Sequence, residues 1–169
     1  VTLRNANGGI TFNAVSNQII GTVLTADARD SVSVNTAVGS LGITAGVIGG
    51  GNVAANLTVN ELNGLGIAGA TTTGGSISIT SGIAGASNLN GAAAINAVTG
   101  NVTLRNSNGA IVLNSQPGQI VGNVLTVDAL DTVDVTSKVT TINASAGVIG
   151  AGNATANLTV NELNGLGIA

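Results

Sequence analysis

The feature that most constrains this chain is a tandem repeat with an offset of 101 residues. The stretch ANLTVNELNGLGIA at Ala55–Ala68 returns letter for letter at Ala156–Ala169, and 42 of the 68 positions in residues 1–68 match residues 102–169 without a gap. We therefore divide the chain into a first full repeat, residues 1–101, and a second, truncated repeat, residues 102–169, of one continuous structure. Repeats of this kind are typical of fibres and arrays, in which each unit packs mainly on its neighbours.

The composition limits both the core and the chemistry. Charged residues make up 7% of the chain, Phe12 is its single aromatic residue, and it has no His, Cys, Met, Trp or Tyr. A core without large aromatic anchors should be thin and built from Val, Ile, Leu and Ala. The net charge of −3, with only four Lys and Arg residues, disfavours nucleic acid as a partner. Without His or Cys, the usual nucleophile–base pairs are excluded, so we expect no enzyme and no cofactor.

Apolar residues alternate with polar ones in short runs that Gly and Asn separate. Leu57 and Val59 flank Thr58, and the run SISIT at residues 76–80 alternates cleanly. A period of two predicts β-strands. The apolar spacing that is typical of a helix does not occur in any stretch without an interrupting Gly or Asn. The sequence therefore predicts an all-β protein with short strands.

Two architectures are compatible with these strands. Asn-Gly pairs at residues 7–8 and 63–64 could be the turns of antiparallel hairpins in a sandwich or meander. Alternatively, successive strands form the turns of a parallel β-helix with four or five turns per repeat. An array of immunoglobulin-like domains would need bulky core residues that this chain lacks. The β-helix is favoured because the strand starts are 22, 33, 20 and 26 residues apart, as corner loops of unequal length would produce; they are Val1, Val23, Asn56, Ser76 and Val102.

Three stretches carry a resemblance to a known family. VTLRNANGGITFNA at residues 1–14, NLTVNELNGLGIAG at residues 56–69 and NVLTVDALDTVDVTS at residues 123–137 are similar to turns of filamentous-haemagglutinin-type adhesins. These are the large exoproteins of bacterial two-partner secretion. The resemblance rests on composition and turn pattern and covers nearly the whole chain. It implies a right-handed parallel β-helix, secretion to the cell surface, and a role in adhesion, aggregation or biofilm formation.

The combined expectation is an all-β, right-handed parallel β-helix (β-solenoid) that forms a structural segment of a secreted bacterial surface filament or adhesin. Its expected partners are neighbouring repeats or subunits stacked end to end, together with the surface of a host or neighbouring cell. Its expected location is extracellular. Membrane insertion is not expected, because Asn, Thr or Ser interrupts every apolar stretch before it reaches eighteen residues.

Carboxylates are the remaining source of chemistry. Asp128, Asp131 and Asp134 lie close together in the second repeat, and the first two have equivalents in the first repeat, Asp27 and Asp30. Carboxylate oxygens are ligands that calcium prefers, so these three residues are candidates for a calcium site. The simpler interpretation, that they are solvated acidic residues on the outer face, is favoured because the first repeat has Ser in place of the third aspartate.

Two other functions known for β-helices remain as alternatives. A polysaccharide-active enzyme would group several Asp with Arg or Lys, but no basic residue lies within three positions of any of the three aspartates. An ice-binding solenoid would present Thr-x-Thr on every turn in one register. The strands here instead carry Thr-x-Asp, Ser-x-Asn and Thr-x-Asn.

Asparagine and glycine have expected structural uses. Asn5, Asn60 and Asn106 follow strands, where a side-chain amide can stack on its counterpart one turn along and satisfy corner backbone groups. The alternative is that each simply forms a turn with left-handed φ. Gly49–Gly51 should form a tight corner that requires positive φ.

Comparison of the two copies predicts the orientation of side chains and the relation between the repeats. Differences that remain apolar should point inward, namely Phe12/Leu113, Ile20/Val121 and Leu41/Ile142. Differences that change character should point outward, namely Ser33/Asp134 and Arg29/Leu130. We also expect the turn Val1–Gly21 to superpose on Val102–Gly122 by translation along the axis with a small twist, and further copies of the repeat to continue on both sides.

Overall fold

The computed structural model describes residues 1–14, 18–85, 87–117, 119–150, 152–165 and 167–168. These residues form strands and no helix, so none of them belongs to a helix long and apolar enough to cross a membrane. The strands are β1 Thr2–Asn5, β2 Ile10–Phe12, β3 Ile19–Ala28, β4 Val32–Ala45, β5 Leu57–Glu61, β6 Leu65–Thr72, β7 Ile77–Ser81, β8 Leu89–Gly91, β9 Ile95–Asn96, β10 Val102–Asn106, β11 Ile111–Leu113, β12 Ile120–Val121, β13 Val124–Ala129, β14 Val133–Lys138, β15 Thr141–Ala146, β16 Leu158–Glu162 and β17 Gly167–Ile168.

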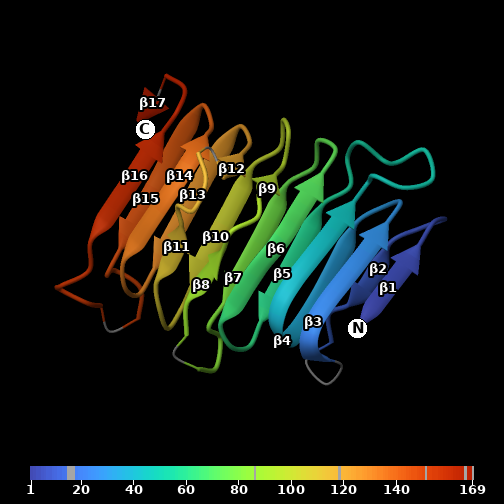
Figure 1. Cartoon of the computed structure of the whole chain (residues 1–169), viewed down its shortest axis with the longest axis horizontal. Helices are drawn as coiled ribbons and strands as arrows, with labels where there is room; N and C mark the ends of the chain where they lie inside the picture. The colour runs from blue at the N-terminus through green and yellow to red at the C-terminus, as the bar shows by residue number, and fades with distance from the viewer. Residues whose placement is uncertain (15–17, 86, 118, 151, 166, 169) are drawn as a thin grey trace.

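The strands wind into a right-handed parallel β-helix, as predicted, with the two ends of the chain at opposite ends of the coil (Figure 1). Pairing defines three stacks. The first stack contains β1, the ends of β3, β4 and β6, then β9, β12 and the end of β14. The second contains β2, the start of β4, then β5, β7, β10, β13, β15 and β17. The third contains the start of β6, then β8, β11, the start of β14, and β16.

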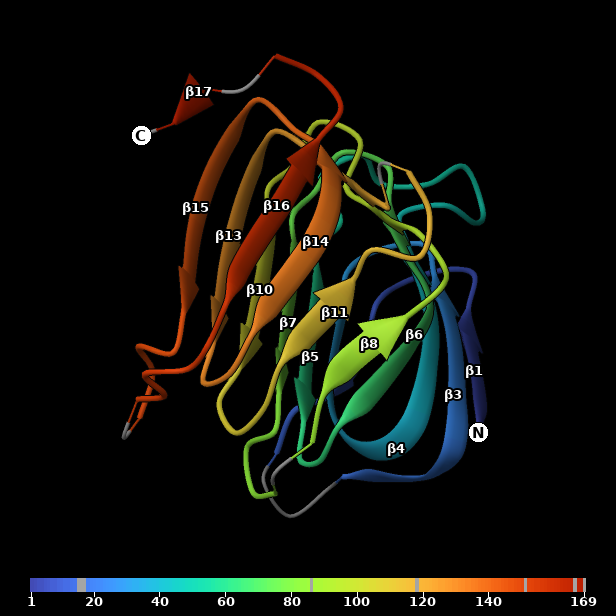
Figure 2. The same ribbon diagram turned by 60° about the vertical axis from the view of Figure 1, so that its left-hand side comes forward.

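The turns differ in length because their corner loops differ. Residues that are equivalent in the second stack are 17 to 26 residues apart, and seven turns separate Ile10 from Ile168. Every strand pair in the described part of the chain is parallel, which excludes the hairpin alternative. The 14-residue strand β4 bends through all three sides of one turn (Figure 2). Gly49, Gly50 and Gly51 have φ of 66°, 77° and 26°, so the expected tight corner is confirmed.

The core is a narrow column of aliphatic side chains. In β5 and β7 the burial alternates strictly, so that Leu57, Val59, Ile77 and Ile79 are fully buried while the residues between them face outward. Each inward residue packs on its counterparts in the turns before and after it. Because strands in a stack are about 4.8 Å apart, the core grows by one thin layer per turn and needs no large aromatic residue.

The two repeats occupy different sides of the solenoid. Leu3 of β1 pairs with Ala26 in the first stack, whereas the equivalent Leu104 of β10 pairs with Ile79 in the second. In the same way β2 lies in the second stack and its repeat β11 lies in the third. One repeat therefore makes four turns plus the step to the next stack.

The expected superposition of Val1–Gly21 on Val102–Gly122 with a small twist is consequently wrong, although residues 15–17 and 118 of these ranges lie outside the described residues. The physical reason is that corner loops set the length of each turn. The unequal turns of one 101-residue repeat do not add up to a whole number of turns. Equivalent segments are thus rotated around the axis by one side of the coil.

The expected orientations are confirmed for one apolar pair, since Leu41 and Ile142 are both buried. In a second pair Leu113 is fully buried, but Phe12 remains 44% exposed. Phe12 lies in the first turn, and only the following turn packs against it. The third expectation is wrong. Ile20 is 74% exposed, and Val121 is aligned with Asn96 and with Lys138 on the outer face. The adjacent Ile19 and Ile120 are the inward residues, because in two consecutive apolar residues only one can face the core.

Candidate functional site

The three candidate calcium ligands each bind a different neighbour. Asp128, on β13 in the second stack, accepts a hydrogen bond from the Ser145 hydroxyl of the following turn. Asp131, at the next corner, accepts one from the side-chain amide of Asn153 at 2.7 Å. Asp134, on β14 in the third stack, accepts one from the Asn114 amide of the preceding turn at 2.6 Å. The three carboxylates are thereby directed to three separate partners.

The first repeat contains the same links. Asp27 accepts a hydrogen bond from the Thr44 hydroxyl at 2.5 Å, and Asp30 accepts one from the Asn52 amide at 3.1 Å. Each of these bonds joins one turn to the next. The pattern favours a structural role in which outward aspartates connect adjacent turns. Within the part of the chain that the structure describes, no three acidic residues are grouped in a way that could hold a metal ion.

A buried glutamate that the sequence analysis did not single out accepts hydrogen bonds from three different residues. Glu61 ends β5 and has no exposed surface. It accepts hydrogen bonds from the Thr36 hydroxyl at 2.6 Å, from the Val38 backbone N–H at 3.0 and 3.2 Å, and from the Asn63 backbone N–H at 3.1 Å. These donors come from the preceding turn and from the corner itself, so the carboxylate fixes the corner between the second and third stacks.

Glu162 forms the equivalent corner in the second repeat, at the end of β16 in the third stack. Its carboxylate accepts hydrogen bonds from the Ser137 hydroxyl, from the Val139 N–H at 3.2 and 3.3 Å, and from the Asn164 N–H at 2.9 Å. Two signals in the sequence could have identified the pair. Both copies carry the glutamate, and in each it occupies the third inward position of an alternating strand, as Glu61 follows Leu57 and Val59.

Asparagine serves in both of the expected ways. Asn60 donates to the Asn35 side-chain oxygen one turn before it at 3.0 Å, which is the predicted stacking of amides. Asn106 is fully buried and donates to the carbonyls of Ser87 at 2.8 Å and Ala110 at 2.9 Å, so it satisfies corner backbone groups. Asn5 does the same for the Gly9 carbonyl at 2.8 Å.

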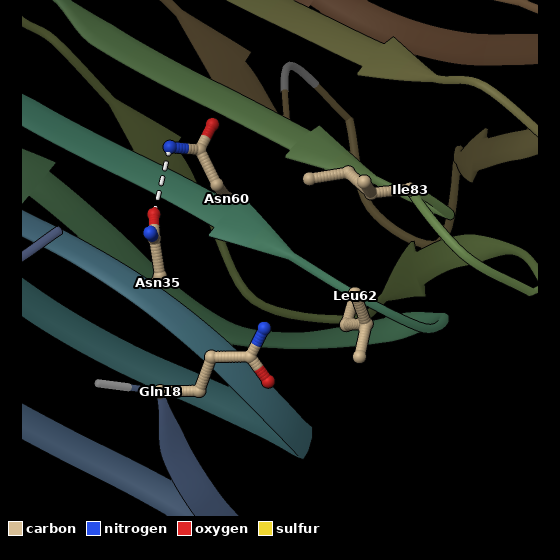
Figure 3. A pocket seen from close by; sticks show the side chains of 5 residues that line it. All are labelled: Gln18, Asn35, Asn60, Leu62 and Ile83. Carbon is tan, nitrogen blue, oxygen red and sulfur yellow. Dashed lines mark hydrogen bonds between the residues drawn. The ribbon is translucent and has the colours of Figure 1, made fainter. Parts of the chain in front are cut away.

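A shallow hollow of about 220 Å³ lies at the edge of the second stack (Figure 3). Its lining consists of Gln18, Asn35, Asn60, Leu62 and Ile83, and two of the amides are already bonded to each other. These groups can pack and hydrogen-bond but supply no acid, base or nucleophile. The hollow therefore carries no argument for catalysis.

One outward column of the second stack carries a hydroxyl group on six successive turns. We call it the hydroxyl column, and it consists of Thr11, Ser33, Thr58, Ser78, Thr103 and Thr126. The seventh turn has Asn143 at the same position. The neighbouring outward column is mixed, with Asn35, Asn60, Thr80, Arg105 and Asp128. The double Thr column that ice binding would require is therefore not formed on these turns.

Comparisons of the chain with protein-family models, with curated proteins and with solved structures give no match.

Proposed function

We propose that this chain is a structural repeat segment of a secreted bacterial surface filament or adhesin that serves adhesion, aggregation or biofilm formation. The supporting observation is the continuity of the solenoid across the repeat boundary. β7 of the first repeat pairs with β10 of the second over five residues, from Ile77–Val102 to Ser81–Asn106, in the same way as strands within a repeat. A solenoid of this kind can be lengthened by adding repeats, because each turn contacts only its neighbours.

Neighbouring repeats or subunits stacked end to end are the partners that we propose first, because each turn of the solenoid pairs with the turns before and after it.

Location is the first experimental test. Antibodies raised against the 169-residue chain should label intact cells of the source bacterium without permeabilisation. Labelling that appears only after permeabilisation would contradict the surface-filament proposal. A cell-binding assay with the purified chain then separates an adhesive segment, which binds host or neighbouring cells, from a spacer, which does not.

The two alternatives have distinct signatures. Turnover of a polysaccharide that is abolished by Asp128→Asn and Asp131→Asn would replace the structural proposal with an enzyme. Thermal hysteresis of freezing in the presence of the chain would replace it with an ice-binding protein. We expect neither activity, because the aspartates link adjacent turns and, on the strands that the structure describes, only one outward column carries regular hydroxyl groups.

A further inference from the structure

We propose that the outward face of the second stack docks on the same face of a second copy, so that two solenoids associate side by side. This proposal rests on the proposed filament function and deepens it by naming a lateral partner and the surface that binds it. The face is formed by β2, the start of β4, β5, β7, β10, β13 and β15, which lie next to one another along the solenoid (Figures 1 and 2).

The hydroxyl column runs along this face with its hydrogen-bonding capacity unused. None of its six hydroxyl groups makes a hydrogen bond to another described residue, whereas neighbouring outward side chains such as Asn60 and Asp128 are bonded to adjacent turns. A hydroxyl group both donates and accepts hydrogen bonds. A column of hydroxyl groups is therefore complementary to a second column of the same kind.

The spacing of the column selects its partner. Its members recur once per turn, about 4.8 Å apart, because that is the distance between paired strands. Another β-solenoid has this same period, so two facing columns stay in phase along their whole length. A partner with a different period would lose register within a few turns.

The distribution of charge permits such a contact. The outward residues of the second stack are uncharged over its first four turns, as in Ser33, Asn35, Thr58 and Asn60. The first stack instead carries charged residues on its outer face, including Arg4, Asp27 and Lys138. Charged side chains are the usual device that keeps β-structures from pairing with one another. On the second stack they occur on the fifth and sixth turns, where Arg105 and Asp128 lie next to Thr103 and Thr126.

Differences between the repeats follow the same division. Thr11 and Ser33 belong to the hydroxyl column, but their equivalents in the second repeat, Val112 and Asp134, lie in the third stack and have no hydroxyl group. In the opposite direction Gly42 lies in the first stack, and its equivalent Asn143 brings a polar side chain to the second. The division is partial, because Thr58, Thr103 and Thr126 of the column match Thr159 on the third stack and Thr2 and Thr25 on the first.

The size of the face sets the strength of the association. Seven turns spaced about 4.8 Å apart, with roughly five residues per strand, give a surface of about 34 by 17 Å, or roughly 1,100 Å² for two copies. Specific interfaces begin near this size, at about 1,000–1,200 Å². We therefore expect weak dimerisation of this chain, and tighter lateral association of any longer array of the same repeats.

A twofold axis parallel to the solenoid axis gives the most extensive contact, because every turn then lies opposite its equivalent. In this arrangement Ser78 faces Ser78 of the second copy. The outward columns on the two sides of the hydroxyl column then lie opposite each other. Arg105 of one copy therefore faces the position of Asn101 in the second copy and does not meet a second arginine.

Single cysteines test this arrangement, since the chain contains none. Under mild oxidation Ser78→Cys, at the middle of the hydroxyl column, should form disulfide-linked dimers several-fold faster than Thr71→Cys on the first stack or Thr159→Cys on the third. Equal rates for the three variants would overturn the proposal. Circular dichroism of each variant confirms that the solenoid is folded.

Sedimentation equilibrium of the unmodified chain is a second test of dimerisation through the hydroxyl column. The monomer–dimer equilibrium should disappear in the triple variant Thr58→Lys, Ser78→Lys, Thr103→Lys and persist in the control Thr71→Lys, Asn90→Lys, Thr159→Lys. Loss of dimers in both variants, or a chain that stays monomeric at all concentrations, would overturn it. The proposal would also be overturned if the chain bound ice or a polysaccharide and this binding were lost in the variant Thr58→Lys, Ser78→Lys, Thr103→Lys but kept in the control. Surface labelling of the bacterium is independent of these results, so the filament function can stand if the lateral contact fails.

Discussion

The first turn of the solenoid and its repeat in the interior have nearly the same sequence and very different surroundings. Val1 is 54% exposed, whereas Val102 is fully buried, and Asn5 is partly exposed where Asn106 has no exposed surface. The reverse holds at the other end, where Leu57 is buried and Leu158 is 49% exposed. Identical residues thus differ because of the turns stacked on them. Burial in this protein is supplied by the neighbouring turn, and stability should depend on position along the axis as much as on residue type.

The largest effect is expected from a charge placed at equivalent interior and terminal positions. Leu57→Asp buries a carboxylate without a partner and should cost more than about 4 kcal/mol, enough to prevent folding. Leu158→Asp can hydrate its charge and should leave a folded chain. Circular dichroism and limited proteolysis distinguish these outcomes. Equal tolerance of the two substitutions would break the comparison.

A cavity placed at equivalent positions should show the same asymmetry on a smaller scale. Leu104→Ala removes a side chain enclosed by turns on both sides and should lower the free energy of unfolding by about 2–5 kcal/mol. Leu3→Ala lies in the first turn, where Leu3 is partly exposed, and should cost clearly less. Urea titration of both variants measures the difference. A larger loss for Leu3→Ala would contradict the weaker enclosure of Leu3 in β1.

The corner glutamates allow a finer test. Glu61→Gln replaces an acceptor oxygen with an N–H₂ group that faces the Val38 N–H, and should cost about 1–3 kcal/mol. Glu162→Gln makes the same change where the carboxylate is partly exposed, so water can replace the lost bonds and the loss should be smaller. The same urea titration applies, and equal losses would show that the last turn is as enclosed as the interior.

The smallest effect is expected at Ser81, an interior residue whose hydroxyl is buried without a hydrogen-bond partner in the described structure. Ser81→Ala should change the free energy of unfolding by no more than about 0.5 kcal/mol, or slightly increase it, because no bond is lost. Thr36→Val is the control, since the Thr36 hydroxyl donates to Glu61 and its removal should cost about 1–3 kcal/mol. A large loss in Ser81→Ala would reveal an unrecognised bond.

The sequence was sufficient to predict the parallel β-helix, since alternation in short runs and the absence of large core residues left few other solutions. It also anticipated the hydrogen-bonding roles of Asn60 and Asn106, although both residues lie within strands and not after them. The buried Glu61 was missed although its alternating position was visible, because a carboxylate is ordinarily assigned to the surface. For adjacent apolar residues such as Ile19 and Ile20, the sequence did not show which side chain faces the core. Either residue can be the inward one in a pattern that alternates every second position.

The relation between the repeats could not be obtained from the sequence, for a physical reason. The number of turns in a repeat depends on how many residues each corner loop takes up, and loops such as 46–56 carry no periodic signal. Without that number, the side of the solenoid on which β10 lies is undetermined. The hydroxyl column was hidden for the same reason. Its members come from non-equivalent positions of the two repeats, for example Ser78 and Thr103.

One repeat makes four turns plus one side of the coil, and distances between spin labels on introduced cysteines measure this rotation. Thr11 and Thr103 lie in one column four turns apart, which corresponds to about 19 Å along the axis. Thr2 lies in the same turn as Thr11 but on the first stack. Electron–electron double resonance should give a shorter distance for Thr11–Thr103 than for Thr2–Thr103. The opposite order would mean that a repeat makes a whole number of turns and would contradict the rotation of the second repeat.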